Sequence, residues 1–182
     1  MSSRTARSIR RVVSAAALGV ILIACSTANP MIGTAAAAPA VAAAANGRSE
    51  GGPSSAQDET RYRTALAPHL LGNSKGIDDA FQRLLTQPAQ PAAAMAADIR
   101  TIALDPAIQL LNDAGSYVPN GEPLTSIHAM FLDSVNQKVR RYQALVDGVS
   151  SGDRSQLAVA QAAAQQEDID LKNWASQVTA LP

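Results

Sequence analysis

The chain has 182 residues, fifteen basic and fifteen acidic side chains, and a single cysteine. One cysteine excludes a disulfide within the chain, so the fold must be stabilised by packing. The charges are unevenly placed: after residue 24 there are eleven basic and fifteen acidic residues, a net charge near −4. Nucleic-acid binding needs a clustered positive surface, so we expect no nucleic-acid partner.

Residues 1–24 have the parts of an export signal. Four arginines lie within the first eleven residues, and an apolar segment runs from Val12 to Ala24. These thirteen residues would span about 20 Å as a helix, which is shorter than a hydrocarbon core of about 30 Å. The segment is therefore predicted to be a removed signal peptide and not a transmembrane anchor.

The residues Leu22, Ile23, Ala24 and Cys25 close the apolar segment. This run resembles the lipobox of bacterial lipoproteins, which implies cleavage before Cys25 and attachment of a diacylglycerol to its sulfur. The alanine excess, with twelve arginines against three lysines, is similar to exported lipoproteins of actinobacteria. That resemblance implies a lipid anchor on the outer face of the cytoplasmic membrane. Ordinary signal cleavage near Ala28, which would give a secreted protein, is the alternative.

Residues 25–56 are rich in alanine, glycine, serine and proline and have few side chains to bury. We interpret them as a tether with an r.m.s. span of about 30 Å. The alternative is an alanine-rich helix from Ala35 to Ala45 that packs on the domain, although Pro39 interrupts it.

Residues 57–182 are predicted to form one all-α domain of about five to six helices, because apolar residues recur three or four apart and strand patterns are missing. Prolines and glycines mark the expected boundaries of the first four helices. The first ends at Pro68 and Gly72, the second follows Gly76, the third begins at Pro91, and the fourth restarts at Pro106 and ends at Gly115.

The last two helices are expected to be long and to form an antiparallel hairpin, because only a short glycine-containing turn separates them. The first has an apolar stripe at Leu124, Ile127, Phe131, Val135, Val139, Tyr142, Val146 and Val149. The second, capped by Asp153, has a coiled-coil seam at Leu157, Ala160, Ala164, Glu167, Leu171, Trp174, Val178 and Leu181. A short turn predicts that facing residues have numbers that sum to about 302.

This register pairs His128 with Trp174, Phe131 with Leu171, Tyr142 with Ala160, and Val135 with Glu167. Glu167 is the one charge in the seam. An ion pair with Lys138, one turn from Val135, would explain it; alternatively Glu167 turns outward and Ile169 inward.

Lys138, Arg140 and Arg141 form a basic group on the same helix. We expect a solvated face, with exposed salt bridges to Glu167, Asp168 and Asp170. Contact with anionic lipid headgroups is the alternative, but a polybasic lipid site usually has about four to eight charges.

Catalytic patterns are missing from the sequence. There is no zinc-binding His-Glu-x-x-His helix, no second cysteine, no Gly-x-Ser-x-Gly elbow and no phosphate loop. The sequence therefore predicts neither an enzyme nor a bound metal or cofactor. It indicates an envelope lipoprotein whose helical domain binds an envelope protein or supports an assembly.

The alternative is a carrier of a small hydrophobic ligand, haem or a lipid, held between helices. The candidate ligand-binding residues are His69, His128, Tyr142 and Trp174, with Tyr62 as a further haem partner. A lipid tail would instead use the alanine-rich face at 160–164. A carrier needs an apolar cavity of at least about 300 Å³. A lone histidine beside an apolar face is otherwise a hydrogen-bonded core residue.

Overall fold

The computed structural model describes residues 53–182. All regular secondary structure in this part is helical, so the all-α class is confirmed. The predictions for the export signal, for Cys25 and for most of the tether lie outside the described residues. None of the described helices combines the length and the apolar character needed to span a bilayer.

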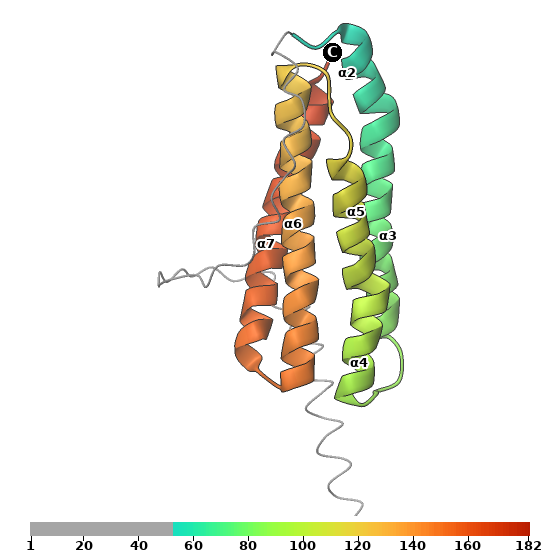
Figure 1. Cartoon of the computed structure of the whole chain (residues 1–182), viewed down its shortest axis with the longest axis vertical. Coiled ribbons are helices and arrows are strands. Elements are labelled where there is room, and N and C mark those ends of the chain that lie inside the picture. The colour runs from blue at the N-terminus through green and yellow to red at the C-terminus, as the bar shows by residue number, and fades with distance from the viewer. Residues whose placement is uncertain (1–52) are drawn as a thin grey trace, which may run out of the picture. The chain divides into compact units, whose positions relative to one another are not determined.

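Within residues 53–182 the helices join into four continuous segments (Figure 1). The first contains α2 (Ala56–Arg61), the π-helical turn η1 (Tyr62–Leu66) and α3 (Ala67–Leu85). The second contains α4 (Ala92–Ile99), the π-helical turn η2 (Arg100–Leu104) and α5 (Asp105–Gly115). The third and fourth are α6 (Glu122–Ser151) and α7 (Arg154–Ala180). The expected count of five to six helices is not confirmed.

Two prolines that were expected at helix boundaries lie inside continuous segments. Each follows a π-helical turn, in which the N–H of Ala67 donates to the carbonyl of Tyr62 and that of Asp105 to the carbonyl of Arg100. In a regular α-helix the proline ring would clash with the carbonyl four residues earlier. The wider turn separates the two groups, so the helix continues through Pro68 and Pro106.

The two π-helical turns have similar sequences. Arg-Thr-Ala-Leu-Ala-Pro starts at Arg63, and Arg-Thr-Ile-Ala-Leu-Asp-Pro starts at Arg100. In both, the threonine hydroxyl donates to a carbonyl four residues earlier, at 2.7 Å for Thr64 and 3.1 Å for Thr101. A π-helical turn followed by a proline thus occurs twice in the described residues.

The expected helix ends at Gly72 and Gly76 are also wrong, because both glycines lie inside α3. A glycine costs a helix only about 1 kcal/mol relative to alanine. Leu70, Ile77 and Phe81 on the same helix are buried in the core. Burial of each such side chain is worth about 2 kcal/mol, which outweighs the glycine penalty.

The helices α6 and α7 lie side by side and run in opposite directions (Figure 1). Gly152, with a φ of +74°, ends α6 in the left-handed conformation. The Asp153 side chain accepts a hydrogen bond from the Ser155 N–H, so the predicted cap of α7 is confirmed. A Cβ on Gly148 would lie 3.1 Å from the Cβ of Gln156, so a small residue lets the helices approach there.

The register between α6 and α7 differs from the predicted one by about one helical turn. Trp174 packs against Phe131, with ring centroids 5.0 Å apart, and not against His128. The pairs Phe131–Trp174 and Lys138–Glu167 both have residue numbers that sum to 305. Glu167 faces inward whereas Ile169 is 51% exposed, so the alternative that exchanged these two residues is also wrong.

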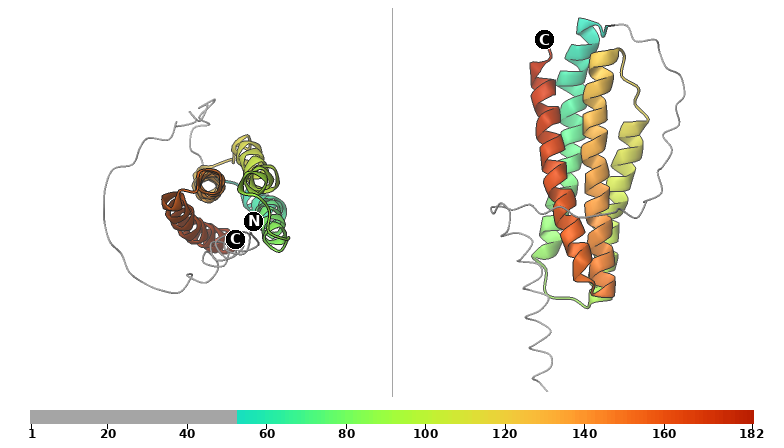
Figure 2. Two further views of the ribbon diagram at one scale, coloured as in Figure 1. Left: turned by 90° about the horizontal axis from the view of Figure 1, so that it is seen from below. Right: turned by 90° about the vertical axis from the view of Figure 1, so that its left-hand side faces the viewer.

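The core lies between the four segments (Figure 2). The predicted stripes of α6 and α7 supply much of it, including Phe131, Val135, Ala160 and Trp174. Leu84, Ile99 and Leu104 contribute from the first two segments.

Candidate functional site

The basic group predicted to form a solvated face is mostly buried. Lys138 is only 1% exposed, whereas Arg140 is exposed. The solvated-face prediction is therefore wrong for Lys138 and for Arg141, because both point between helices to meet carboxylates. We name the group Asp78, Lys138, Arg141, Tyr142 and Glu167 the charge cluster.

Within the charge cluster, Lys138 Nζ lies 2.5 Å from Asp78 Oδ2 and 2.7 Å from Glu167 Oε1. Arg141 also pairs with Asp78, and its Nη1 lies 2.9 Å from Glu167 Oε2. The Tyr142 hydroxyl donates to Asp78 at 2.7 Å. Two cations thus face two carboxylates, and the ion pair predicted between Lys138 and Glu167 is confirmed. The cluster joins α3, α6 and α7.

The electrostatics of this cluster are those of a structural ion-pair network. Burial by itself would raise the pKa of Asp78, but the charges of Lys138 and Arg141 hold that pKa below its ordinary value. Burial is also the main reason that the pKa of Tyr142 is raised. Both groups therefore keep a fixed protonation state near neutral pH, and neither is poised to exchange a proton.

A second group, which we name the aromatic–histidine cluster, contains Tyr62, Tyr117, His128, Phe131 and Trp174. His128 is 2% exposed, and both of its ring nitrogens have partners. Nδ1 lies 3.1 Å from the Tyr62 hydroxyl, and Nε2 lies 2.9 Å from the carbonyl oxygen of Ala114. Trp174 Nε1 donates to the Tyr62 hydroxyl at 3.3 Å.

The candidate ligand-binding residues therefore lie in three places. His128 and Trp174 are in the aromatic–histidine cluster, and Tyr142 is in the charge cluster. His69 is exposed on α3, where its Nε2 lies 3.2 Å from Asn73 Nδ2. The structure does not bring the two histidines together, and His128 has the hydrogen-bonded core arrangement.

The alanine-rich face of α7 is only partly available to a lipid tail. Ala160 and Ala163 are buried against the rest of the domain, whereas Ala162 is exposed. Among the described residues, no three or more histidine, cysteine, aspartate or glutamate side chains gather in a way that could hold a metal ion.

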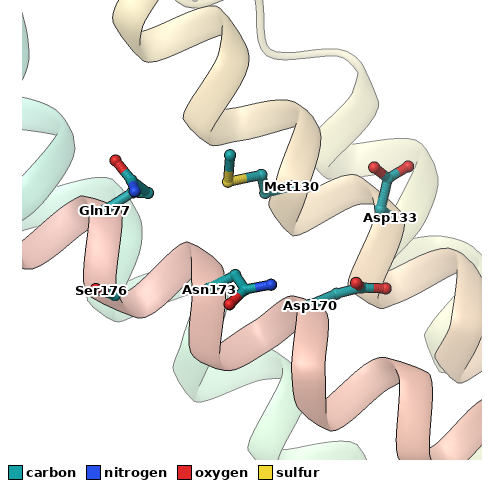
Figure 3. Close-up of a pocket in the computed structure, with 6 residues that line it drawn as sticks. All are labelled: Met130, Asp133, Asp170, Asn173, Ser176 and Gln177. Carbon is teal, nitrogen blue, oxygen red and sulfur yellow. The ribbon is translucent and has the colours of Figure 1, made fainter.

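A groove of about 250 Å³ lies on the surface between α6 and α7 (Figure 3). Its lining combines one apolar side chain with carboxylates, amides and a hydroxyl: Met130, Asp133, Asp170, Asn173, Ser176 and Gln177. Asp133 and Asp170 lie toward one end of the groove, and Ser176 and Gln177 toward the other (Figure 3). This α6–α7 groove is smaller and more polar than the cavity that a carrier would need.

The acidic end of the groove is electrostatically unfavourable. Partial burial, and then the charge of Asp170, raise the pKa of Asp133 above its ordinary value. Asp170 accepts a hydrogen bond from Gln166 at 2.8 Å, and no described lysine or arginine pairs with either carboxylate. A cation placed here would relieve the repulsion between them.

Sequence reasoning missed the groove. A signal was present, because Asp170, Asn173 and Gln177 recur at three and four residues and form a polar stripe beside the apolar seam of α7. Met130 and Asp133 have the matching spacing on α6. A polar stripe is ordinarily a solvated face, so its spacing alone does not reveal a groove.

The described part of the chain is a helical bundle. The charge cluster and the aromatic–histidine cluster lie inside it, and the α6–α7 groove lies on its surface. No known protein family model, curated protein or solved structure matches the chain.

Proposed function

We propose that this chain is a non-enzymatic cell-envelope lipoprotein whose helical domain acts as a binding or scaffolding module. In this proposal Cys25 carries the lipid, residues 25–56 are the tether and residues 57–182 are the module. The lipobox-like run before Cys25 and the basic, apolar start of the chain support the anchor. Export and anchoring on the outer face of the cytoplasmic membrane follow from it.

The α6–α7 groove is the observation that carries the binding role. Its carboxylates favour a cation, Met130 offers an apolar surface, and the amides can bond to a peptide backbone. A lysine or arginine on a polypeptide has this combination of a charged head, an aliphatic stem and amides. We therefore propose an envelope protein as the partner, docked through a basic side chain.

In this proposal α6 and α7 form an antiparallel hairpin that gives the groove a rigid base. The contacts Lys138–Glu167 and Phe131–Trp174 support this, since they fix the two helices along their length. Helices presented in this way hold a binding surface more precisely than loops do.

The groove can be tested with a photo-crosslinking residue in the native host. We expect cross-links to a partner from position 176, inside the groove, and none from position 165, which is exposed on α7 but does not line it. The double variant Asp133→Asn, Asp170→Asn should reduce the cross-link several-fold. The control Asp168→Asn removes an exposed charge outside the groove and should leave it unchanged. Equal cross-linking from both positions, or no effect of the double variant, would refute the role of the groove.

The anchor has a separate test. The full chain should fractionate with membranes and yield a lipid-modified N-terminal peptide at Cys25, and Cys25→Ala should appear in the medium or remain unprocessed. An unmodified mature protein that begins near residue 29 would instead establish ordinary cleavage and secretion.

A further inference from the structure

Four side-chain and backbone groups form a continuous hydrogen-bonded chain through one end of the bundle. Trp174 Nε1 bonds to the Tyr62 hydroxyl, the hydroxyl to His128 Nδ1, and His128 Nε2 to the carbonyl of Ala114. These residues come from α7, η1, α6 and α5. This series of hydrogen bonds therefore connects all four helical segments.

The groups at the two ends of this hydrogen-bond series determine which group donates and which accepts in every bond. An indole N–H can only donate and a backbone carbonyl can only accept. The Ala114 carbonyl therefore requires a proton on His128 Nε2, and neutral His128 then accepts at Nδ1 from the Tyr62 hydroxyl. Burial raises the pKa of Tyr62 to about 12, so its hydroxyl keeps its proton in the physiological range.

The described residues that pack around the His128 ring offer no countercharge. Tyr62 from η1, Tyr117 from the 116–121 linker and Phe131 from α6 pack around it, and Trp174 from α7 contacts Tyr62 and Phe131. No described carboxylate forms an ion pair with His128. Tyr117, whose ring centroid lies 5.3 Å from that of His128, is 38% exposed.

A second proton on His128 is incompatible with this arrangement. Nδ1 would become a donor and face the hydroxyl that now donates to it. The Tyr62 hydroxyl, which already accepts from Trp174, would have to turn its own proton toward an apolar surrounding. A buried charge and an unsatisfied donor would both result. Burial accordingly lowers the pKa of His128, despite the hydrogen bond to Ala114.

We propose that His128 holds Tyr62 only while its ring is neutral. A second proton on the ring breaks this hydrogen bond and releases Tyr62, and with it α2 and η1, from the rest of the bundle. This goes beyond the binding role proposed above and concerns a different part of the domain. The released end is the one at which the described residues begin. Two further contacts hold this end: Ser54 packs against Gly121, and Arg63 donates to the carbonyl of Leu181 at 2.6 Å. Acidification would thus loosen the end of the domain that follows the tether.

Hydrogen exchange of the full chain at pH 7.5 and pH 5 tests this proposal, after correction for the pH dependence of chemical exchange. Exchange in residues 56–66 should accelerate several-fold at the lower pH, while that in 134–146 stays unchanged. The chain has only two histidines, so His69→Asn is a matched control and should keep the acceleration. His128→Asn cannot gain the proton and should lose it. Unchanged exchange in the wild type, or acceleration in His128→Asn, would overturn the proposal.

Tyr62→Phe gives a second measurement that keeps the histidine. Without the hydroxyl, a second proton on His128 breaks no bond to η1. We expect exchange in residues 56–66 to be faster at both pH values but no longer to depend on pH, and the imidazole, followed by NMR, to titrate at a higher pH than in the wild type. An unaltered imidazole titration would contradict the proposed coupling between Tyr62 and His128.

Discussion

Lys138 Nζ on α6 lies 2.7 Å from Glu167 Oε1 on α7, and neither side chain is more than 7% exposed. A buried ion pair adds little stability compared with an apolar pair, but removing one partner leaves the other charge buried without compensation. The pair therefore fixes how α6 and α7 align more than it strengthens their contact.

Lys138→Met tests this directly. We expect a loss of about 3 kcal/mol in the free energy of unfolding, because Asp78 and Glu167 are left with Arg141 alone. The double variant Lys138→Met, Glu167→Leu should recover most of that loss. Lys172→Met removes an exposed lysine paired with Asp168 and should cost less than about 1 kcal/mol. Urea unfolding measures all three, and equal effects of the two single lysine variants would contradict the expectation.

Asp78 should make the domain sensitive to strong acid. Its pKa is lowered on folding, because Lys138 and Arg141 outweigh the effect of burial. Its contribution to stability is therefore complete well above the ordinary value of 3.8 and is lost as the pH falls through the folded value. In urea unfolding from pH 5 downward, the stability difference between wild type and Asp78→Asn should shrink. Asp79→Asn, on the exposed side of α3, should keep the wild-type acid dependence.

Asp133→Asn should stabilise the domain while weakening the proposed docking. Its pKa is raised by burial and by Asp170, so the ionised form is disfavoured in the folded state. Removing the charge should raise the free energy of unfolding at pH 7 by about 0.5 kcal/mol or less, since Asp133 is exposed and solvent screens its charge. The measurement is thermal unfolding beside the cross-linking assay. Lower stability of Asp133→Asn would contradict the proposed repulsion.

Replacing either of two glycines by alanine should change the stability of the domain, in opposite directions for the two positions. Gly121 has a φ of +89°, and a Cβ there would overlap the backbone of Ser54, so Gly121→Ala should cost about 2 kcal/mol. Gly72 lies inside α3 with no atom near the position of a Cβ, so Gly72→Ala should gain about 0.5 to 1 kcal/mol. Thermal unfolding distinguishes the two, and a destabilised Gly72→Ala would indicate a contact that the structure lacks.

Periodicity predicted the helical class and the buried face of α7, because spacing in sequence sets which residues share a helix face. It did not predict the alignment of neighbouring helices. α6 continues through Gly148 to Ser151, so the turn is Gly152–Asp153, and its own residue numbers sum to 305, like those of Phe131–Trp174 and Lys138–Glu167. Glycines at both 148 and 152 allow more than one position for the turn, so the pattern alone does not locate it.

Residue type gives the wrong prediction where a charged or helix-breaking residue has a specific partner. The basic run Lys138, Arg140 and Arg141 predicts a solvated face, yet two carboxylates from other helices pair with Lys138. Pro68 predicts a helix end, yet a π-helical turn accommodates it. The spacing indicates only Glu167, the charge in the seam of α7, as a partner of Lys138; it indicates neither the contact with Asp78 nor the π-helical turn.

The two π-helical turns also constrain how this chain can vary. A π-helical turn is one residue longer than the regular helical path that it replaces, so the extra residue and the following proline are needed together. A related chain without Pro68 should therefore have one residue fewer between Tyr62 and Leu66, and one without Pro106 should have one fewer between Arg100 and Leu104. Single-residue gaps coupled to loss of a proline would be the signature of this bundle among distant relatives.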